Sequence, residues 1–299
     1  MTFEDLFNLF FQEVHDATLC RKAMYEGWQV GVVIPARNES EHLSKVLETI
    51  PELVDKVVVV DDGSNDGTGK LAVGVELVTL EGEGVGAAID SGHQHLLKIF
   101  NGKFISVVMA GDGQMDPDDL EGLITPIVNA KAHHVKGERI DRAGKMPVYR
   151  RVGTFILAIL TTLACGQTIK DPQCGYTATS SDVLRNWNWT VSWKGYGYPN
   201  WWLMRLSEGG WIIKHIPVKA IYSGQKSGIR VSTFLPKVAL MLLLGLHTRI
   251  LRNTIKKPSL PLLFTWVTYT AGWIYSPLMF VITHLSDRVH VYSIMRDVK

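Results

Sequence analysis

The chain has 299 residues, of which 46% are hydrophobic and 20% are charged, and this length accommodates one large α/β domain or two modest ones. Its 31 basic and 29 acidic side chains leave a net charge of +2, which argues against a dedicated nucleic-acid-binding protein and an acidic disordered tail. The three cysteines show no CxxC spacing, so the sequence favours a reducing compartment over a disulfide framework or a zinc site.

The first 28 residues lack the basic start and the uninterrupted apolar run of a secretory signal. Their apolar residues recur at helical spacing and predict an amphipathic helix, which packs on the main domain or, as the less favoured alternative, lies in a membrane interface. These apolar residues are Phe3, Leu6, Phe7, Phe10 and Val14.

From Val30 onward, short β-branched runs alternate with longer amphipathic stretches. Strands are expected at 30–34, 57–60, 75–80 and 104–109, with helices at about 40–50, 67–72, 85–100 and 117–130. Strands that are apolar on both faces and alternate with helices predict a mostly parallel sheet covered on both sides. Ligands of such sheets bind beyond the carboxyl ends of the strands, where the unusual polar residues of this chain cluster.

The character of the sequence changes after about residue 230. The apolar run Val238–Leu246 is too short to span a bilayer, and a basic cluster follows it at Arg249, Arg252, Lys256 and Lys257. Residues 258–286 then contain no Lys, Arg, Asp or Glu, which is long enough for a transmembrane helix, with a hairpin or an in-plane helix as alternatives. If the segment spans, the basic cluster favours a cytoplasmic N-terminal domain.

Two polar loops follow the first two expected strands. The first reads Pro35-Ala36-Arg37-Asn38-Glu39, and the second begins with the carboxylate pair Asp61-Asp62 and continues as a Gly/Ser/Asn turn. Carboxylates at a strand end can accept hydrogen bonds from a nucleobase edge or from ribose hydroxyls. The segment 65–68 is alternatively a turn that caps the next helix, and the combination of both loops favours ligand binding.

A third polar loop, Ala110-Gly-Asp-Gly-Gln-Met-Asp116, closes the fourth expected strand. Asp112 and Gln114 stand two residues apart, so an extended backbone directs both side chains to the same side. Their hard oxygens suit Mg²⁺ or Mn²⁺ shared with a diphosphate. Asp116 is instead expected to be the N-cap of the following helix.

The blocks VVIPARNE, VVVVDDGSNDGT, GVGAA and GDGQMDP, in this order, resemble the inverting family 2 glycosyltransferases of GT-A fold, and among them the polyprenyl-phosphate glycosyltransferases. The similarity covers roughly residues 29–230. It implies a Rossmann-like α/β domain, a nucleoside diphosphate sugar donor, Mg²⁺ or Mn²⁺, and inversion at the anomeric carbon. By position it implies donor contacts at Pro35, Ala36, Arg37, Glu39, Asp61, Asp62, Gly84, Gly86 and Asp112, and metal ligation by Asp112 with Gln114.

Two departures from the family pattern affect this site. Ala110 stands where the family has the first Asp of its DxD element, so Asp112 carries more of the metal site. Gly82 and Glu83 replace the more usual Asn and basic residue beside the glycine-rich stretch. Because a carboxylate beside a diphosphate is unfavourable, we expect the Glu83 side chain to point away. Close packing of a helix N-terminus on the sheet is the structural alternative for this stretch.

Downstream basic residues resemble the family's phosphate-binding segment. A polyprenyl phosphate already carries an ionised nucleophilic oxygen, so its transferase needs cations more than a general base. The resemblance implies acceptor-phosphate contacts, and a catalytic role, for Arg139, Arg150 and Arg151; Lys226 and Arg230 are added from the loop expected to close over the phosphates.

Two further segments bear on the acceptor. Asp171 belongs to a stretch resembling the family's D-P-x-x-G-Y, where it orients an arginine, touches the sugar or holds a loop. Asn200 stands where relatives that act on saccharides place an acidic base, and an amide cannot accept the proton of a sugar hydroxyl.

The expected protein is therefore a membrane-associated glycosyltransferase facing the cytoplasm, with an N-terminal helix at 1–28, a GT-A domain at 29–230 and a membrane-associated helical region at 231–299. Its partners are the nucleotide sugar, a polyprenyl phosphate and the membrane, with no nucleic acid; homo-oligomerisation stays open. The rivals are a saccharide or another lipid as acceptor, and a nucleotide-sugar-binding protein without activity. A Rossmann dehydrogenase is disfavoured because no GxGxxG follows the first strand.

Overall fold

The computed structural model describes residues 25, 27–140, 148–221, 231–256 and 258–275. Its centre is a seven-stranded sheet with the order β3-β2-β1-β4-β6-β5-β7. The strands are β1 (Trp28–Ala36), β2 (Lys56–Asp62), β3 (Glu76–Leu80), β4 (Lys103–Val108), β5 (His134–Arg139), β6 (Thr177–Ser180) and β7 (Ile213–Val218).

The sheet is mostly parallel, as the sequence predicts. β1 pairs in parallel with β2 and β4, β2 with β3, and β5 with β7, whereas β6 runs antiparallel to both β4 and β5. Within this sheet, every strand except β6 therefore points its carboxyl end to one edge. The loops after β1, β2 and β4 and the end of β5 meet there.

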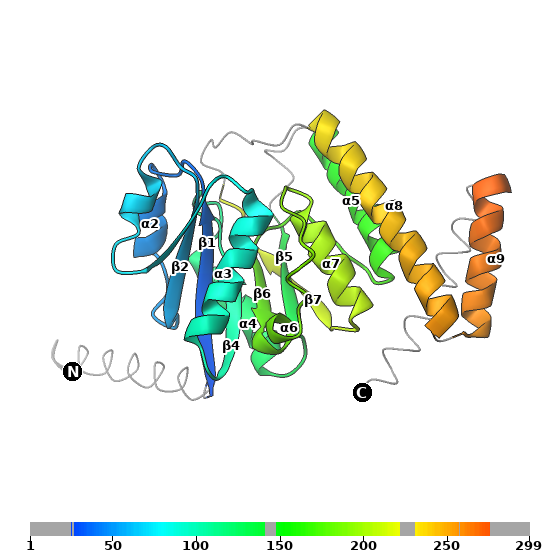
Figure 1. The fold of residues 1–299 in the computed structure, drawn as a ribbon, viewed down its shortest axis with the longest axis horizontal. Helices are drawn as coiled ribbons and strands as arrows, with labels where there is room; N and C mark the ends of the chain where they lie inside the picture. The colour runs from blue at the N-terminus through cyan, green and yellow to red at the C-terminus, as the bar shows by residue number, and fades with distance from the viewer. Residues whose placement is uncertain (1–24, 26, 141–147, 222–230, 257, 276–299) are drawn as a thin grey trace, which may run out of the picture.

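Helices cover both faces of the sheet (Figure 1). One core lies between the sheet, α2 and α4, and contains Val32, Leu43 and Leu123; the other lies under α3, α6 and α7, and contains Val33, Leu96 and Trp202. The α-helices are α2 (Leu43–Glu48), α3 (Val85–Ile99), α4 (Leu120–Val128), α5 (Val148–Cys165), α6 (Ser181–Arg185), α7 (Tyr198–Glu208), α8 (Val231–Lys256) and α9 (Leu260–Tyr275), with 3-10 turns η1 (Thr68–Leu71) and η2 (Pro117–Asp119).

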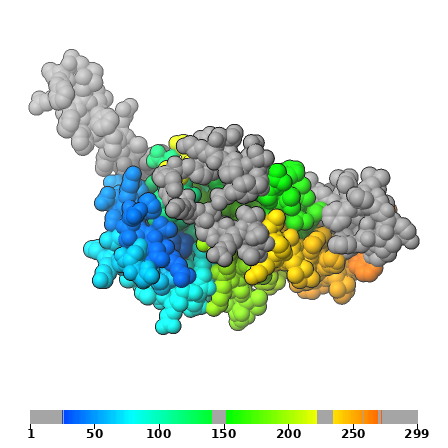
Figure 2. All heavy atoms as spheres, turned by 90° about the horizontal axis from the view of Figure 1, so that it is seen from above, coloured from blue at the N-terminus to red at the C-terminus, as the bar shows by residue number. Residues whose placement is uncertain are grey.

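Helices α5 and α8 pack side by side at the end of the sheet beyond α7, and α9 follows α8 (Figure 1). Seen from above, α8 and α9 lie on the side of the molecule opposite β1–β3 (Figure 2). Arg249 of α8 is buried, and its guanidinium donates to the carbonyls of Leu163 and Ala164 at 2.8 and 2.9 Å. These are among the last carbonyls of α5, which a helix end leaves without intrahelical partners.

The C-terminal expectations need one correction. The apolar run 238–246, expected to be too short to span a bilayer, is part of a longer helix, because α8 continues from Val231 to Lys256. Among the described residues, Phe234–Lys256 is the one helix whose length and composition suffice to cross a membrane, although one third of its apolar window is buried against the protein. Two members of the basic cluster have partners within the protein. Arg249 donates hydrogen bonds to α5, and Arg252 forms an ion pair with Glu208.

Two predicted segments lie mainly outside the described residues. The N-terminal helix expected over 1–28 falls there except for Tyr25 and residues 27–28. Of the charge-free stretch 258–286, the structure describes residues 258–275. This part forms α9, whose 16 residues rise about 24 Å, less than the ~30 Å hydrocarbon core of a bilayer.

Candidate active site

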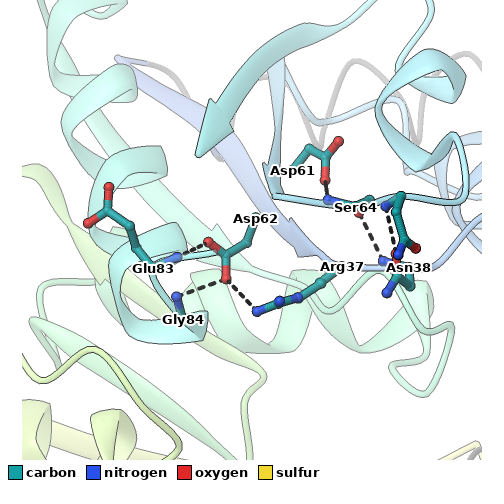
Figure 3. Close-up of polar contacts among 8 residues, drawn as sticks. Arg37, Asn38, Asp61, Asp62, Ser64, Glu83 and Gly84 are labelled. Carbon is teal, nitrogen blue, oxygen red and sulfur yellow. Dashed lines mark hydrogen bonds and ion pairs between the residues drawn. The ribbon is translucent and has the colours of Figure 1, made fainter. Parts of the chain in front are cut away.

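Side-chain hydrogen bonds join the loop after β1 to the loop after β2. The Asn38 N–H donates to Ser64 Oγ at 2.9 Å, and the Asn65 N–H donates to Asn38 Oδ1 at 3.0 Å (Figure 3). The Glu39 N–H donates to Thr68 Oγ1 at 2.8 Å. Asn38 takes a positive φ of 56°, a conformation that asparagine tolerates better than most residues. The two polar loops therefore form one connected surface.

Asp62 is 3% exposed and uses both carboxylate oxygens to hold another loop. Its Oδ1 accepts from the Glu83 N–H at 2.6 Å, and its Oδ2 accepts from the Gly84 N–H at 2.8 Å. Arg37 Nη1 lies 3.8 Å from the same Oδ2. The Glu83 side chain points away from Asp62 (Figure 3) and pairs with Lys194 at 2.7 Å. Asp62 thus fixes the glycine-rich turn before α3, a role that sequence reasoning did not assign to it.

The remaining residues of the first two loops are placed by backbone geometry. Pro35 and Ala36 end β1, with Ala36 buried and Pro35 half-buried. Asp61 Oδ1 accepts from the Ser64 N–H at 3.0 Å (Figure 3). A Cβ on Gly69 would lie 2.5 Å from Asp61 Oδ2, so the chain passes close to this carboxylate. Asp61 supports the turn after β2.

The glycine-rich stretch packs against the loop before α7. The Gly86 N–H donates to the Lys194 carbonyl at 2.8 Å, and a Cβ on Gly84 would lie 2.5 Å from the same oxygen. A Cβ on Gly86 would lie 2.0 Å from the Trp193 carbonyl oxygen. The atoms nearest to a Cβ at either glycine therefore belong to this loop and to Tyr198, while α3 itself packs on β1 and β2, as the structural alternative expects. Donor contacts at Gly84 and Gly86 stay a prediction.

Asp112 lies at the carboxyl end of β4, within the electrostatic reach of the first loop. Its Oδ1 accepts from the Gln114 N–H at 3.0 Å, and burial raises its pKa, while the charge of His42 lowers it. Burial and the charge of Asp112 raise the pKa of Glu39. His42 thus neighbours the two carboxylates, and no motif in the sequence pointed to it. Asp116 is the expected N-cap, accepting from the Asp118 N–H at 3.1 Å.

The oxygen atoms of Asp112 and Gln114 fit a divalent cation whose remaining ligands come from a substrate. Among the described residues, no group of three or more His, Cys, Asp and Glu side chains could hold a metal by itself. Mg²⁺ is commonly held by one or two carboxylates together with substrate phosphate oxygens, so a full protein cage is not required. A cation would also relieve the mutual repulsion of Asp112 and Glu39.

Arg139 ends β5 and forms a two-pronged ion pair with Asp171. Its Nε donates to Oδ2 at 2.7 Å and its Nη2 donates to Oδ1 at 2.9 Å. Asp171 is 0% exposed, and its Oδ2 also accepts from the Arg139 N–H at 3.3 Å. Of the roles considered for Asp171, these contacts support the orientation of an arginine, and they also hold the turn that begins at Asp171 against β5.

The other predicted acceptor residues are described only in part. Arg150 and Arg151 belong to the first turn of α5, but their side chains lie outside the described set, as do Lys226 and Arg230 entirely. Asn200 is fully buried at the start of α7. Its Nδ2 donates to Thr161 Oγ1 at 2.7 Å and its Oδ1 accepts from Gln173, so its amide links α7 to α5 and to the turn beyond Asp171.

Comparison with known proteins identifies the family to which the sequence is similar. The profile of Glycosyl transferase family 2 matches residues 31–188. The UDP-N-acetylglucosamine–dolichyl-phosphate N-acetylglucosaminyltransferase of Methanococcus voltae is 28% identical over 216 residues, covering 64% of this chain and 85% of that protein. The undecaprenyl-phosphate mannosyltransferase of Micrococcus luteus is 30% identical over 205 residues, covering 64% and 82%.

The fold has solved neighbours as well. A crystal structure of glucosyl-3-phosphoglycerate synthase from Mycobacterium tuberculosis, in complex with Mn²⁺, UDP and phosphoglyceric acid, matches with a TM-score of 0.56 at 22% identity, covering 76% of this chain and 80% of that one. The similarity confirms the expected GT-A fold. With more than half of its length matched by one family profile, the chain belongs to Glycosyl transferase family 2.

Proposed function

We propose that the chain transfers a sugar from a nucleoside diphosphate sugar to a polyprenyl phosphate, with inversion at the anomeric carbon, at the cytoplasmic face of a membrane. The observation that carries this proposal is the position of Arg139. The buried Asp171 aligns its guanidinium at the sheet edge that also bears Asp62 and Asp112. The Arg139 guanidinium and the polar loops proposed to bind the nucleotide sugar thus lie at the same edge of the sheet. Transfer between two phosphate-bearing substrates requires both substrates to bind at one place.

The donor is proposed to occupy the joined loops after β1 and β2. Residues 35–39 and the turn after Asp61 offer backbone groups and carboxylates to the nucleoside, and the Asp62 contacts hold the neighbouring turn in shape. Arg37 stands 57% exposed beside Asp62, where its guanidinium can meet a base or a phosphate. The neighbouring synthase with UDP supports a nucleotide ligand of this class.

Asp112 and Gln114 are the residues proposed to hold Mg²⁺ or Mn²⁺ together with the donor diphosphate. A bound divalent cation supplies positive charge against the diphosphate as it departs. Ala110 provides no carboxylate, so oxygens of the substrate and of water would complete the coordination. The Mn²⁺ present in the neighbouring synthase supports a divalent cation as a ligand of this class of fold.

The acceptor phosphate is proposed to bind Arg139, with Arg150, Arg151, Lys226 and Arg230 as further cations. Its ionised oxygen attacks the anomeric carbon from the face opposite the departing diphosphate, which inverts the configuration. Catalysis then consists mainly of positioning and charge stabilisation, because the nucleophile needs no general base. The buried amide of Asn200, bonded to Thr161 and Gln173, is consistent with a mechanism without a base at that position.

Membrane association is supported by apolar side chains exposed on three neighbouring helices. Contiguous exposed apolar surface marks a binding surface for lipid or protein. We propose that residues 231–299, the region after the GT-A domain of 29–230, bring the site to the lipid. The exposed residues are Val152, Phe155, Ile156 and Ile159 of α5, Leu240, Leu244, Leu251 and Ile255 of α8, and Leu260, Leu263, Phe264, Trp266 and Val267 of α9.

One experiment tests the proposal and its rivals together. The full chain in detergent is incubated with a panel of UDP- and GDP-sugars, Mg²⁺ or Mn²⁺, and either short prenyl phosphates or neutral saccharide and diacylglycerol acceptors, with products identified by mass spectrometry. We expect a glycosyl prenyl phosphate of inverted configuration. Transfer only to neutral acceptors contradicts the proposed acceptor, and donor binding without any transfer contradicts the proposed activity.

A further inference from the structure

Lys136 of β5 is a fully buried lysine to which the proposed reaction gives no role. Its side chain is 1% exposed, three residues before Arg139. A buried ammonium loses its hydration, so lysines are rarely buried without partners. Lys136 Nζ donates a hydrogen bond to the Cys174 carbonyl oxygen, and the charge of Asp171 favours its protonated form.

These contacts make Lys136 one of the ties between β5 and the turn that carries Asp171. The Gly137 N–H donates to the Tyr176 carbonyl at 2.9 Å beyond the turn, and Arg139 binds Asp171 at its start. The bond from Lys136 to Cys174, a residue between Asp171 and Tyr176 in sequence, holds the last residue of the turn. Without it, a buried carbonyl would lose its partner, and the turn would have to move to satisfy that oxygen.

We propose that Lys136 is a positioning residue for the acceptor phosphate: it holds the 171–174 turn in the place from which Asp171 aligns the Arg139 guanidinium. This inference rests on the proposed function, because Arg139 is there the acceptor-binding group. Lys136 itself touches no substrate. It borders a cavity of about 30 Å³, also lined by Gly175, Thr177 and Tyr198, which accommodates about one water molecule and no sugar.

The charge state of Lys136 adds a second readout. Burial, together with the charge of Arg139, lowers the pKa of Lys136 to about 8, against the opposing effects of Cys174 and Asp171. Above that pH the hydrogen bond to Cys174 loses its charge assistance, and Asp171 loses a neighbouring cation. The other groups facing it from the packed elements are His134 on the same strand, His215 on β7, and His93 and Tyr198, which line the cavity from α3 and α7.

The test is Lys136→Met, which keeps the length of the side chain and removes its donor. We expect the acceptor KM to rise about tenfold, with the donor KM within about twofold of the parent value, because a small displacement of a binding group weakens only the ligand it contacts. Lys214→Met is the matched control, since Lys214 is an exposed lysine on the neighbouring strand β7. An acceptor KM unchanged in Lys136→Met, or raised together with the donor KM, overturns the inference.

A pH series on the parent chain keeps the inference testable if Lys136→Met does not fold. We expect the acceptor KM to rise between pH 7 and 9.5 with a midpoint near 8, while the donor KM shows no such break. An acceptor KM without this break overturns the inference. Both measurements require that the parent chain transfers sugar to prenyl phosphate; if it transfers none, the proposed function has failed instead, so the two failures are distinguishable.

Discussion

Arg139 and Asp171 meet through two hydrogen bonds, Nε to Oδ2 at 2.7 Å and Nη2 to Oδ1 at 2.9 Å, across 32 positions of sequence. The carboxylate is fully buried, whereas the arginine side chain is 23% exposed. The buried carboxylate therefore holds the partly exposed Arg139 guanidinium at the edge of the sheet. Two-pronged pairing fixes the plane of a guanidinium as well as its position, which a lysine in its place could not reproduce.

Asp171→Asn should weaken acceptor binding selectively. The amide can accept from one guanidinium nitrogen but turns an N–H₂ group toward the other, and breaking a buried pair costs roughly 3 kcal/mol. Part of this free-energy cost lowers the stability of the fold and part lowers the affinity for the acceptor. We therefore expect the acceptor KM to rise at least tenfold with little change in donor KM. Steady-state kinetics with both substrates varied provides the measurement.

Glu138→Gln is the control for this change, because it makes the same carboxylate-to-amide replacement at the residue before Arg139. Glu138 pairs with Lys170 at 2.9 Å, and the lysine is 57% exposed. Exposed pairs of this kind contribute ~0–1 kcal/mol, so the variant should keep both KM values. Equal effects of the two substitutions would show that the burial of Asp171 has no special consequence for the acceptor.

Asp112→Asn should abolish transfer and leave the fold intact. Burial raises the pKa of Asp112, which means that its ionised form is unfavourable in the folded chain, and a neutral amide removes that penalty. We therefore expect an unchanged or slightly higher melting temperature together with loss of turnover. Chelation of divalent cations should likewise stop the parent enzyme, and added Mn²⁺ should restore it. Turnover near the parent rate in this variant would remove Asp112 from the mechanism.

Asp116→Asn, four residues from Asp112, is expected to have the opposite effect: a small loss of stability with turnover retained. Asp116 caps η2 through the Asp118 N–H at 3.1 Å and pairs with Lys219 at 3.4 Å, so its contribution is structural. An asparagine is also a good N-cap, and we expect a loss of stability of at most about 1 kcal/mol with turnover retained. Thermal melts and rates measured side by side separate the two aspartates.

The sequence predicted the central strands because their residues are apolar on both faces. Val32, Val33, Val58 and Val59 are each fully buried, and a run of such residues has few alternatives to a strand covered on both sides. β5, β6 and β7 were not predicted. β5 reads HVKGER, a polar sequence that becomes buried only because β6 and β7 flank it, and β6 has four residues. Such strands depend on tertiary pairing that no local pattern encodes.

The site shows the same division. The spacing of the polar loops identified the edge of the sheet, since each loop follows an apolar run. The partners of those residues come from distant segments: Glu83 and Gly84 for Asp62, and Asp171 for Arg139. Lys136 could not be singled out, because a lysine in a polar segment is normally exposed. The apolar run 238–246 was judged too short to span a bilayer because Arg249, which is buried against α5, was interpreted as the start of a separate basic cluster.

Gly86→Ala should destabilise the domain strongly. The added Cβ would lie 2.0 Å from the Trp193 carbonyl oxygen and 2.7 Å from the Tyr198 ring, and a backbone oxygen cannot move as a flexible side chain can. We expect a loss of at least about 2–3 kcal/mol in the free energy of unfolding, or a chain that does not fold. In Gly153→Ala, within α5, the Cβ meets nothing within 4 Å, and this variant should be neutral or more stable by about 0.5–1 kcal/mol. Similar melting temperatures for the two variants would contradict the close packing of Gly86.

Buried histidines should make the fold sensitive to acid. Burial lowers the pKa of His93 to about 3, whereas the unfolded chain takes up this proton near pH 6.5, so the contribution of His93 to stability is lost progressively as the pH falls below 6.5. The slope is at most about 1.4 kcal/mol per pH unit. Asp90 acts in the opposite direction, because burial raises its pKa and acid then favours the folded state. His93→Asn isolates the first effect: in urea unfolding, the stability of the parent relative to this variant should fall between pH 7 and 5. A constant difference would mean that His93 gains a proton in the folded chain as readily as in the unfolded one.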